Sequence, residues 1–127
     1  MKNILLVLLS FTLVSLVAAQ DWSAQRLLAD PDKNLGKKVS LFIYKVEVPA
    51  INATDDAEFR DFSVYTAKRY NTTYESGGYI TVRVSRKDAS SFTQKYGTST
   101  NYKNAKNFVG VFRSENGAFL VDATVAP

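Results

Sequence analysis

The sequence predicts a mainly β domain of five strands, with one helix between the third and the fourth strand. Stretches rich in β-branched and aromatic residues recur along the chain, and several alternate apolar and polar residues, which is typical of half-buried strands. Residues 77–98 begin with that alternation and then place apolar residues at helical spacing. The sequence contains no internal repeat and no low-complexity segment, so we expect one domain.

Residues 1–19 are expected to be a signal peptide. Lys2 provides a positive charge, residues 4–17 are apolar, and Val17-Ala18-Ala19 resembles a cleavage box. The apolar stretch is too short to predict a membrane span, and an uncleaved anchor is the alternative. We expect cleavage after that box and export of a β-barrel domain, residues 20–127, to the periplasm or the extracellular space, with no membrane span.

The composition removes most familiar catalytic groups. The chain has no cysteine and no histidine, so it can form no disulfide and no thiolate metal site, and it lacks the commonest general base. We therefore expect no metal, no cofactor and no enzymatic activity. The formal net charge is +4, and loss of Lys2 lowers it to +3, a mildly basic balance that favours anionic partners at low salt.

A short helix is expected to open the exported domain. Ser23 can accept hydrogen bonds from the first free N–H groups of this helix, and its apolar side consists of Ala24, Leu27 and Leu28. Pro31 is expected to end the helix, and residues 32–36 to form a turn.

Residues 37–49 are the longest predicted strand and are rich in β-branched and aromatic residues. One face consists of Val39, Leu41 and Ile43, and the other of Phe42, Tyr44, Val46 and Val48. A strand that is apolar on both faces is buried on both or strongly coiled. The second face is expected to lie under the helix at 23–29, and a contact between subunits is the alternative.

The second and third strands are predicted at residues 59–67 and within 77–85, joined by a hairpin loop at 68–78. Their inward side is apolar and consists of Phe62, Val64, Ile80, Val82 and Val84. The alternation places six other residues on the outward side: Asp61, Ser63, Tyr65, Tyr79, Thr81 and Arg83.

The helix follows the third strand directly. Its apolar side consists of Ala89, Phe92 and Tyr96, and Gly97 ends it. Ser85 and Asp88 have the spacing of a capping box. Residues 104–113 and 117–125 are the last two strands, joined by a Ser-Glu-Asn-Gly turn. Such a helix can plug one open end of a closed five-stranded sheet and carry the chain from the third strand to the fourth.

This order of elements resembles the OB-fold, a five-stranded Greek-key barrel. The resemblance covers residues 25–123 and is strongest in LLADPDKNLGKKVSLFIYKV, where a short helix and a turn lead into a long strand. The chain is similar to exported bacterial OB-fold domains of the tRNA-anticodon-binding type. The first strand has Phe42-Ile43 where many OB-folds bend at a glycine. A cystatin-like fold is the alternative, but its order of elements has no helix after the third strand.

The OB-fold resemblance implies a ligand across the second and third strands, between the loops after the first and fourth strands. The candidates there are Tyr65, Tyr79, Arg83, Asp61 and Thr81, with Lys68 and Arg69 on the hairpin loop beside Tyr70 and Tyr74. Tyrosine rings can stack on bases while cations follow phosphates, or pack on a sugar whose hydroxyl groups meet Asp61, Ser63 and Thr81. A Tyr65–Tyr79 pair that only stabilises the sheet, beside a solvated Arg83, is the alternative.

Two other charged groups offer weaker candidates. Arg86 and Lys87 fall in the first helical turn and could hold an anion there, although two solvated charges on an exposed turn are the favoured interpretation. Residues 55–61 contain Asp55, Asp56, Glu58 and Asp61, which could bind Ca²⁺, but they lack EF-hand spacing and are expected to form a solvated acidic loop. Asn52 and Asn71 begin glycosylation sequons.

We therefore expect an exported, non-enzymatic OB-fold binding module without a cofactor or metal. Its ligand is a polyanion such as nucleic acid or an acidic glycan, an oligosaccharide, or a protein. Two alternatives remain open: an assembly subunit that oligomerises through the first strand, and a metal-dependent nuclease that uses the carboxylates at 55–61.

Overall fold

The structure is a computed structural model that describes residues 22–47, 58–70, 73–97 and 101–125. Its elements are α2 (Ala24–Ala29), α3 (Pro31–Asn34), β1 (Lys38–Glu47), β2 (Phe59–Tyr70), β3 (Thr73–Ser85), η1 (Arg86–Asp88), α4 (Ala89–Tyr96), η2 (Tyr102–Asn104), β4 (Lys106–Glu115) and β5 (Ala118–Asp122). The predicted mainly β class, with a helix between the third and fourth strands, is confirmed. The expected signal peptide lies outside the described residues, and no described helix is long and apolar enough to cross a membrane.

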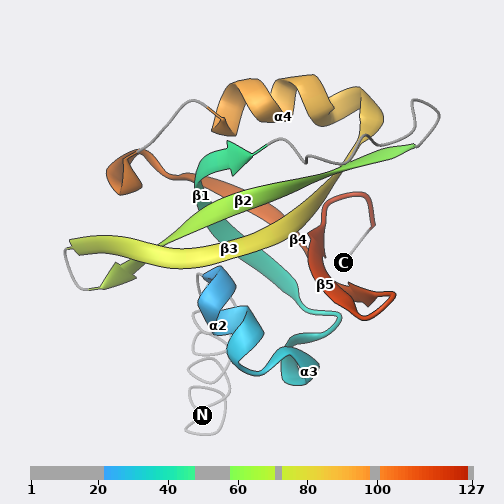
Figure 1. Ribbon diagram of the computed structural model, residues 1–127, viewed down its shortest axis with the longest axis horizontal. Coiled ribbons are helices and arrows are strands. Elements are labelled where there is room, and N and C mark those ends of the chain that lie inside the picture. The colour runs from blue at the N-terminus through green and yellow to red at the C-terminus, as the bar shows by residue number, and fades with distance from the viewer. Residues whose placement is uncertain (1–21, 48–57, 71–72, 98–100, 126–127) are drawn as a thin grey trace, which may run out of the picture.

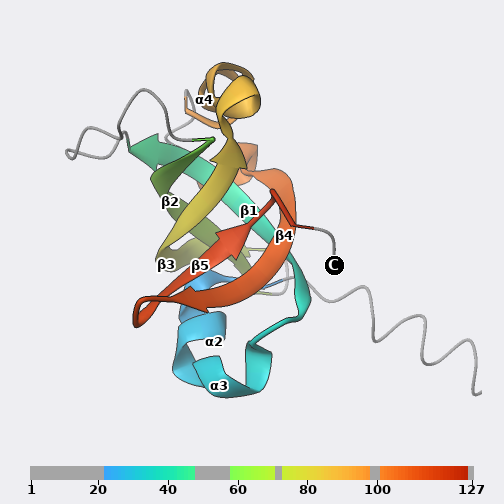
Figure 2. The same cartoon turned by 90° about the vertical axis from the view of Figure 1, so that its right-hand side faces the viewer.

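The five strands pair in the order β1-β2-β3-β5-β4, and β4 pairs back with β1, so the sheet closes into a barrel. Every pairing is antiparallel except that of β3 with β5. The helix α4 covers one end of the sheet, and α2 and α3 lie at the other end (Figure 1). Figure 2 shows β5 between β3 and β4, where it closes the sheet. The crossover through α4 is what allows β5 to run parallel to β3.

The core lies inside the closed sheet, as the alternation predicts. The inward side chains Phe62, Val64, Ile80, Val82 and Val84 are all buried. Phe92 and Tyr96 of α4 are buried over the end of the sheet, and the Phe92 ring centroid lies 5.2 Å from that of Phe62. The predicted role of this helix as a plug is therefore confirmed by its contacts.

A bulge in β1 changes which residues face the core. Val39, Leu41 and Ile43 are buried as predicted, but Tyr44 is buried too, and the register against β2 shifts between Ile43 and Lys45. The strict alternation predicted for this strand is therefore wrong beyond Ile43. The bulge provides the bend that a glycine would otherwise allow, and it brings Val46 against the core.

The hairpin of β2 and β3 is longer than predicted. Lys68 and Arg69 pair with residues of β3, so they lie on a strand and not on the expected loop. Thr66 is fully buried at the base of this extension, and its hydroxyl donates to Gly78 O at 2.9 Å and accepts from Ala24 N at 3.0 Å. A Cβ on Gly77 would lie 2.9 Å from that hydroxyl. Only glycine therefore allows α2 to pack this closely on the hairpin.

The structure at the ends of the helices differs from the sequence-based predictions in three further respects. Ser23 caps α2 by accepting from Arg26 N, as predicted, but Leu28 is 41% exposed and does not join its buried side. The prediction that the first helix stops at Pro31 is confirmed, since α2 ends at Ala29. Pro31 also begins a second helix, α3, where proline is well tolerated at the first position, so the turn predicted at residues 32–36 is wrong over 32–34. The Ser85 hydroxyl donates to Asp88 Oδ2 at 2.7 Å and caps no backbone N–H, so the capping box predicted there is wrong.

The last two strands are shifted relative to the prediction. β4 begins at Lys106 after the η2 turn, and β5 ends at Asp122. The turn between them is confirmed, with positive φ at Asn116 (52°) and Gly117 (81°). Two such residues in succession match a tight hairpin turn, and this turn brings Glu115 beside the outward side of β3.

Candidate functional site

The outward side of β2 and β3 carries three cross-strand pairs, which we call the outer face. They are Asp61–Arg83, Ser63–Thr81 and Tyr65–Tyr79. The predicted grouping of these residues is therefore confirmed. The two tyrosine ring centroids lie 5.9 Å apart, and Tyr79 is 65% exposed. An exposed ring of this size is available to a ligand as well as to its neighbour in the sheet.

A row of four tyrosines extends from this pair across β1 to η2. The centroid of Tyr44 lies 6.2 Å from that of Tyr65 and 4.7 Å from that of Tyr102. Burial raises the pKa of the Tyr44 hydroxyl, and the neighbouring Tyr102 raises it further. The expectation that the first helix covers this side of β1 is wrong for Tyr44, because Tyr102 packs on it. Sequence alternation missed this row, since it depends on the bulge and on the η2 turn.

Tyr65, the second tyrosine of the row, contacts two charged neighbours on β1. The Tyr65 hydroxyl donates to Glu47 Oε1 at 3.2 Å, and this hydrogen bond raises the pKa of Tyr65. The Lys45 ammonium lies 5.1 Å from the Tyr65 ring centroid and forms an ion pair with Glu47. Tyr65 therefore has a fixed orientation, whereas Tyr79 presents an open ring.

Arg83 is not the solvated cation that one interpretation of the sequence expected. It is only 8% exposed, and its Nε and Nη2 donate to the two oxygens of Asp61 at 2.9 and 3.1 Å. Its Nη1 donates to Glu115, and its guanidinium lies 3.7 Å from the Phe59 ring centroid. The hydrogen bond with Asp61 raises the pKa of Arg83, so the group stays charged. Its charge is offset by two carboxylates and is not free for a phosphate.

A cavity of about 350 Å³ adjoins this ion-pair network. Asp61, Thr81 and Arg83 line one side of it, and Glu115 and Asn116 line the other. Sequence analysis named the first three residues but not the last two. Glu115 and Asn116 could have been predicted from the OB-fold resemblance, because it implies that the loop after the fourth strand contributes to the site.

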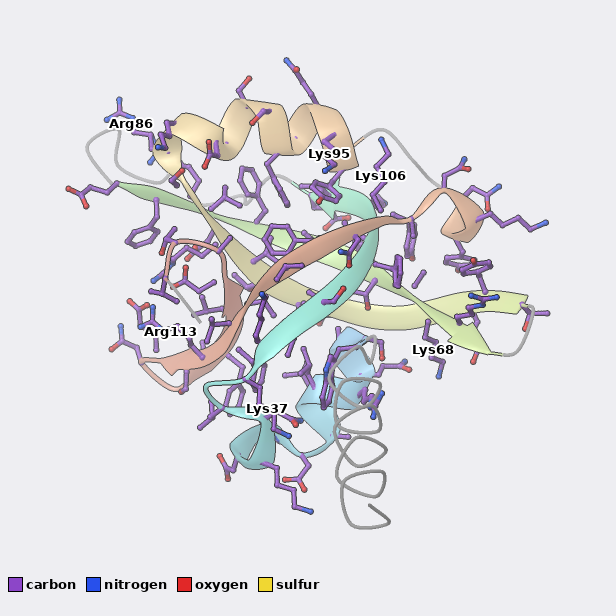
Figure 3. The ribbon with its side chains drawn as sticks, turned by 180° about the vertical axis from the view of Figure 1, so that it is seen from behind. Lys37, Lys68, Arg86, Lys95, Lys106 and Arg113 are labelled. Carbon is purple, nitrogen blue, oxygen red and sulfur yellow. The ribbon has the colours of Figure 1, made fainter. Side chains whose placement is uncertain are left out.

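Together with the charged side chains of β1 and β4 that contact it, the outer face carries a net charge of −1. Lys45 and Arg83 contribute two positive charges, and Glu47, Asp61 and Glu115 contribute three negative ones. Basic side chains are instead distributed around the molecule, as the labelled lysines and arginines in Figure 3 show. A face with this charge does not attract a polyanion. Its exposed oxygens are mainly acceptors, which suit hydroxyl donors.

The other predicted residues do not join this face. Arg86 and Lys87 are exposed on η1 beside α4, and Figure 3 shows Arg86 far from Lys68. Lys68 and Arg69 line a separate groove against α2.

Some predicted residues lie outside the described part of the chain. These are the side chain of Tyr70 and residues 48–57 and 71–72, which include Asp55, Asp56 and both sequon asparagines. Within the described part of the chain, no three acidic side chains gather as a metal site would require.

Comparisons with protein-family models, with curated proteins and with solved structures find no match to this chain. Three properties of the outer face and its charged neighbours bear on function: the exposed Tyr79 ring, the carboxylates and the net charge.

Proposed function

We propose that this protein is an exported, non-enzymatic OB-fold module that binds an oligosaccharide on its outer face. The sheet order, the parallel pairing of β3 with β5 and the position of α4 agree with an OB barrel. In such barrels the strand 2–3 face and the loop after strand four bind oligonucleotides or oligosaccharides. Here the corresponding elements are β2, β3 and the β4–β5 turn.

The observation that carries the proposal is the exposed Tyr79 ring, on the same side of β3 as Thr81 and Arg83, which line a cavity where the charge of Arg83 is neutralised. The electron-rich face of a tyrosine ring attracts the weakly positive C–H groups of a sugar. The carboxylates of Asp61 and Glu115, held by Arg83, are oriented to accept hydrogen bonds from sugar hydroxyl groups. A nucleic acid would need free cations along its backbone, and this face carries a net negative charge.

The test is a calorimetric or NMR titration of the purified protein with neutral hexasaccharides of cellulose, chitin, xylan and starch. We expect at least one of them to bind with little dependence on salt, because no counterions are released. Tyr79→Ala should weaken that binding about tenfold, which corresponds to ~1.4 kcal/mol of lost ring contact.

Tyr74→Ala is the matched control, because Tyr74 is also an exposed tyrosine of β3 but lies on the hairpin extension. Its binding should equal that of the unaltered protein. The protein could instead bind single-stranded DNA with an affinity that rises steeply as the salt concentration falls. If Tyr79→Ala abolished that binding, the oligosaccharide proposal would be wrong and the face would recognise nucleic acid.

A further inference from the structure

Part of the lining of the cavity that adjoins Arg83 is apolar. This part consists of Phe62 of β2 and of Ala118, Phe119 and Leu120 of β5. The volume of the cavity, about 350 Å³, is at the lower end of the range for small-molecule sites. A whole hexasaccharide does not fit inside such a cavity. Only one group of an oligosaccharide can therefore enter it while the rest of the chain lies on the outer face.

The apolar lining is held in place by the core. The ring of Phe119 stacks on that of Phe112, with centroids 5.6 Å apart and an angle of 11° between the planes. Phe112 is fully buried, so it gives Phe119 a fixed support. Leu120 is also buried, and it pairs with Thr81 of β3. The apolar surface is therefore preformed, which lowers the cost of ordering it around a ligand.

Groups that form hydrogen bonds line the same cavity. The hydroxyl groups of Ser63 and Thr81 and the side-chain amide of Asn116 can each donate and accept. The Glu115 carboxylate only accepts, and it retains acceptor capacity beyond its ion pair with Arg83. The cavity thus offers apolar contact together with partners for both a donor and an acceptor.

The exposed Tyr79 ring lies close to this cavity along β3. Thr81, which lines the cavity, follows Tyr79 by two residues on the same side of the strand, a separation of about 6.6 Å between backbone positions. One oligosaccharide chain can therefore stack on Tyr79 and place a group of a neighbouring sugar in the cavity.

We propose that the cavity binds the acetamido group of an N-acetylated amino sugar, so that the outer face prefers N-acetylated oligosaccharides such as those of chitin. This inference rests on the proposed function of the outer face. An acetamido group consists of a methyl group, an amide N–H that donates and a carbonyl oxygen that accepts, and each part has a partner in the cavity. A hydroxyl group at the same position of the sugar would leave the apolar lining uncovered.

Hexasaccharides of chitin and of cellulose give the matched comparison. Their chains have the same linkage and differ in one group of each sugar, which is an acetamido group in chitin and a hydroxyl group in cellulose. Both are neutral, so the charge of the outer face does not distinguish them. The purified protein is titrated with each by calorimetry. We expect the chitin hexasaccharide to bind about tenfold more tightly, because one more apolar group is buried in a fitted cavity.

Two variants locate the acetamido group. Ala118 is exposed on β5, and Ala118→Leu should fill the apolar part of the cavity and remove the preference for chitin. Ala29→Leu, the same change at an exposed position of α2 outside the cavity, is the matched control and should keep the preference. Asn116 has a φ of 52°, which glycine adopts without strain. Asn116→Gly therefore keeps the turn but removes the side-chain amide, and it should lower the preference for chitin about fivefold.

Tyr79→Ala separates this inference from the proposed function. Tyr79 does not line the cavity, and its ring is expected to contact the sugars of both chains. The variant should therefore bind both hexasaccharides more weakly and keep the preference for chitin.

Two results would overturn the inference and leave the proposed function intact. The first is an equal or weaker affinity for the chitin hexasaccharide while that of cellulose, xylan or starch binds. The second is an unchanged preference in Ala118→Leu or Asn116→Gly with an unchanged circular dichroism spectrum, because the acetamido group would then lie elsewhere. If none of the four hexasaccharides bound, the proposed function would be wrong and the inference with it.

Discussion

Replacing Arg83 with methionine should destabilise the protein. Methionine keeps much of the apolar stem but removes the donors to Asp61 and Glu115. Hydrogen bonds to charged groups contribute about 1.5–3 kcal/mol each when well shielded. The side chains of Asp61 and Glu115 are 36% and 37% exposed, so solvent screens part of this energy. We expect a loss of about 2 kcal/mol in the free energy of unfolding near pH 7.

Urea unfolding at pH 7, followed by Trp22 fluorescence, measures this loss of stability. Arg86→Met is the matched control, because Arg86 is exposed on η1, and its stability should change by less than about 0.5 kcal/mol. A deficit for Arg83→Met that is below about 0.5 kcal/mol, and so no larger than that of Arg86→Met, would refute the reasoning.

Two further predictions concern buried polar groups. Thr66→Val leaves the Ala24 N–H buried without its acceptor, so it should cost about 2 kcal/mol in urea unfolding, whereas Thr81→Val on the outer face should cost less than about 0.5 kcal/mol. Burial raises the pKa of Asp122, but hydrogen bonds from Thr124 and the ion pair with Arg113 outweigh burial and lower it overall. This stabilisation is present above the unfolded pKa of about 3.9 and is lost as pH falls through the lower folded value. Asp122→Asn should therefore be less stable than the unaltered protein near pH 7, and the two melting temperatures should converge as pH falls below about 4; a constant difference would contradict this assignment.

The sequence predicts which residues lie on the outer face, but it does not predict how their charges are paired. The alternation of polar and apolar residues correctly brings Asp61, Tyr65, Tyr79 and Arg83 to one side, because successive side chains of a strand point to opposite faces. It could not show that Arg83 is neutralised, since one of its partners is Glu115, which follows it by 32 residues. Whether the face attracts anions depended on that one distant contact.

The groove between α2 and the hairpin, which Lys68 and Arg69 line, could not be predicted from local patterns. Lys68 and Arg69 were expected on a loop beside the outer face, but the hairpin continues as a paired extension and carries them toward α2. Trp22 and Phe42 reach the same groove from two other segments. Nothing in the local spacing of these residues encodes their proximity, because it depends on how α2 packs on the closed sheet.

The sequence by itself determined the local structure of this protein: five strands with an intervening helix, the inward row of apolar side chains, and the turn at Asn116-Gly117. These features follow from side-chain periodicity and from backbone preferences, which act over a few residues. Only the tertiary structure decided which charges meet. Ion pairs such as Arg83–Glu115 form between distant segments once the sheet closes, and electrostatic energy depends on distance in space and on burial, not on separation along the chain.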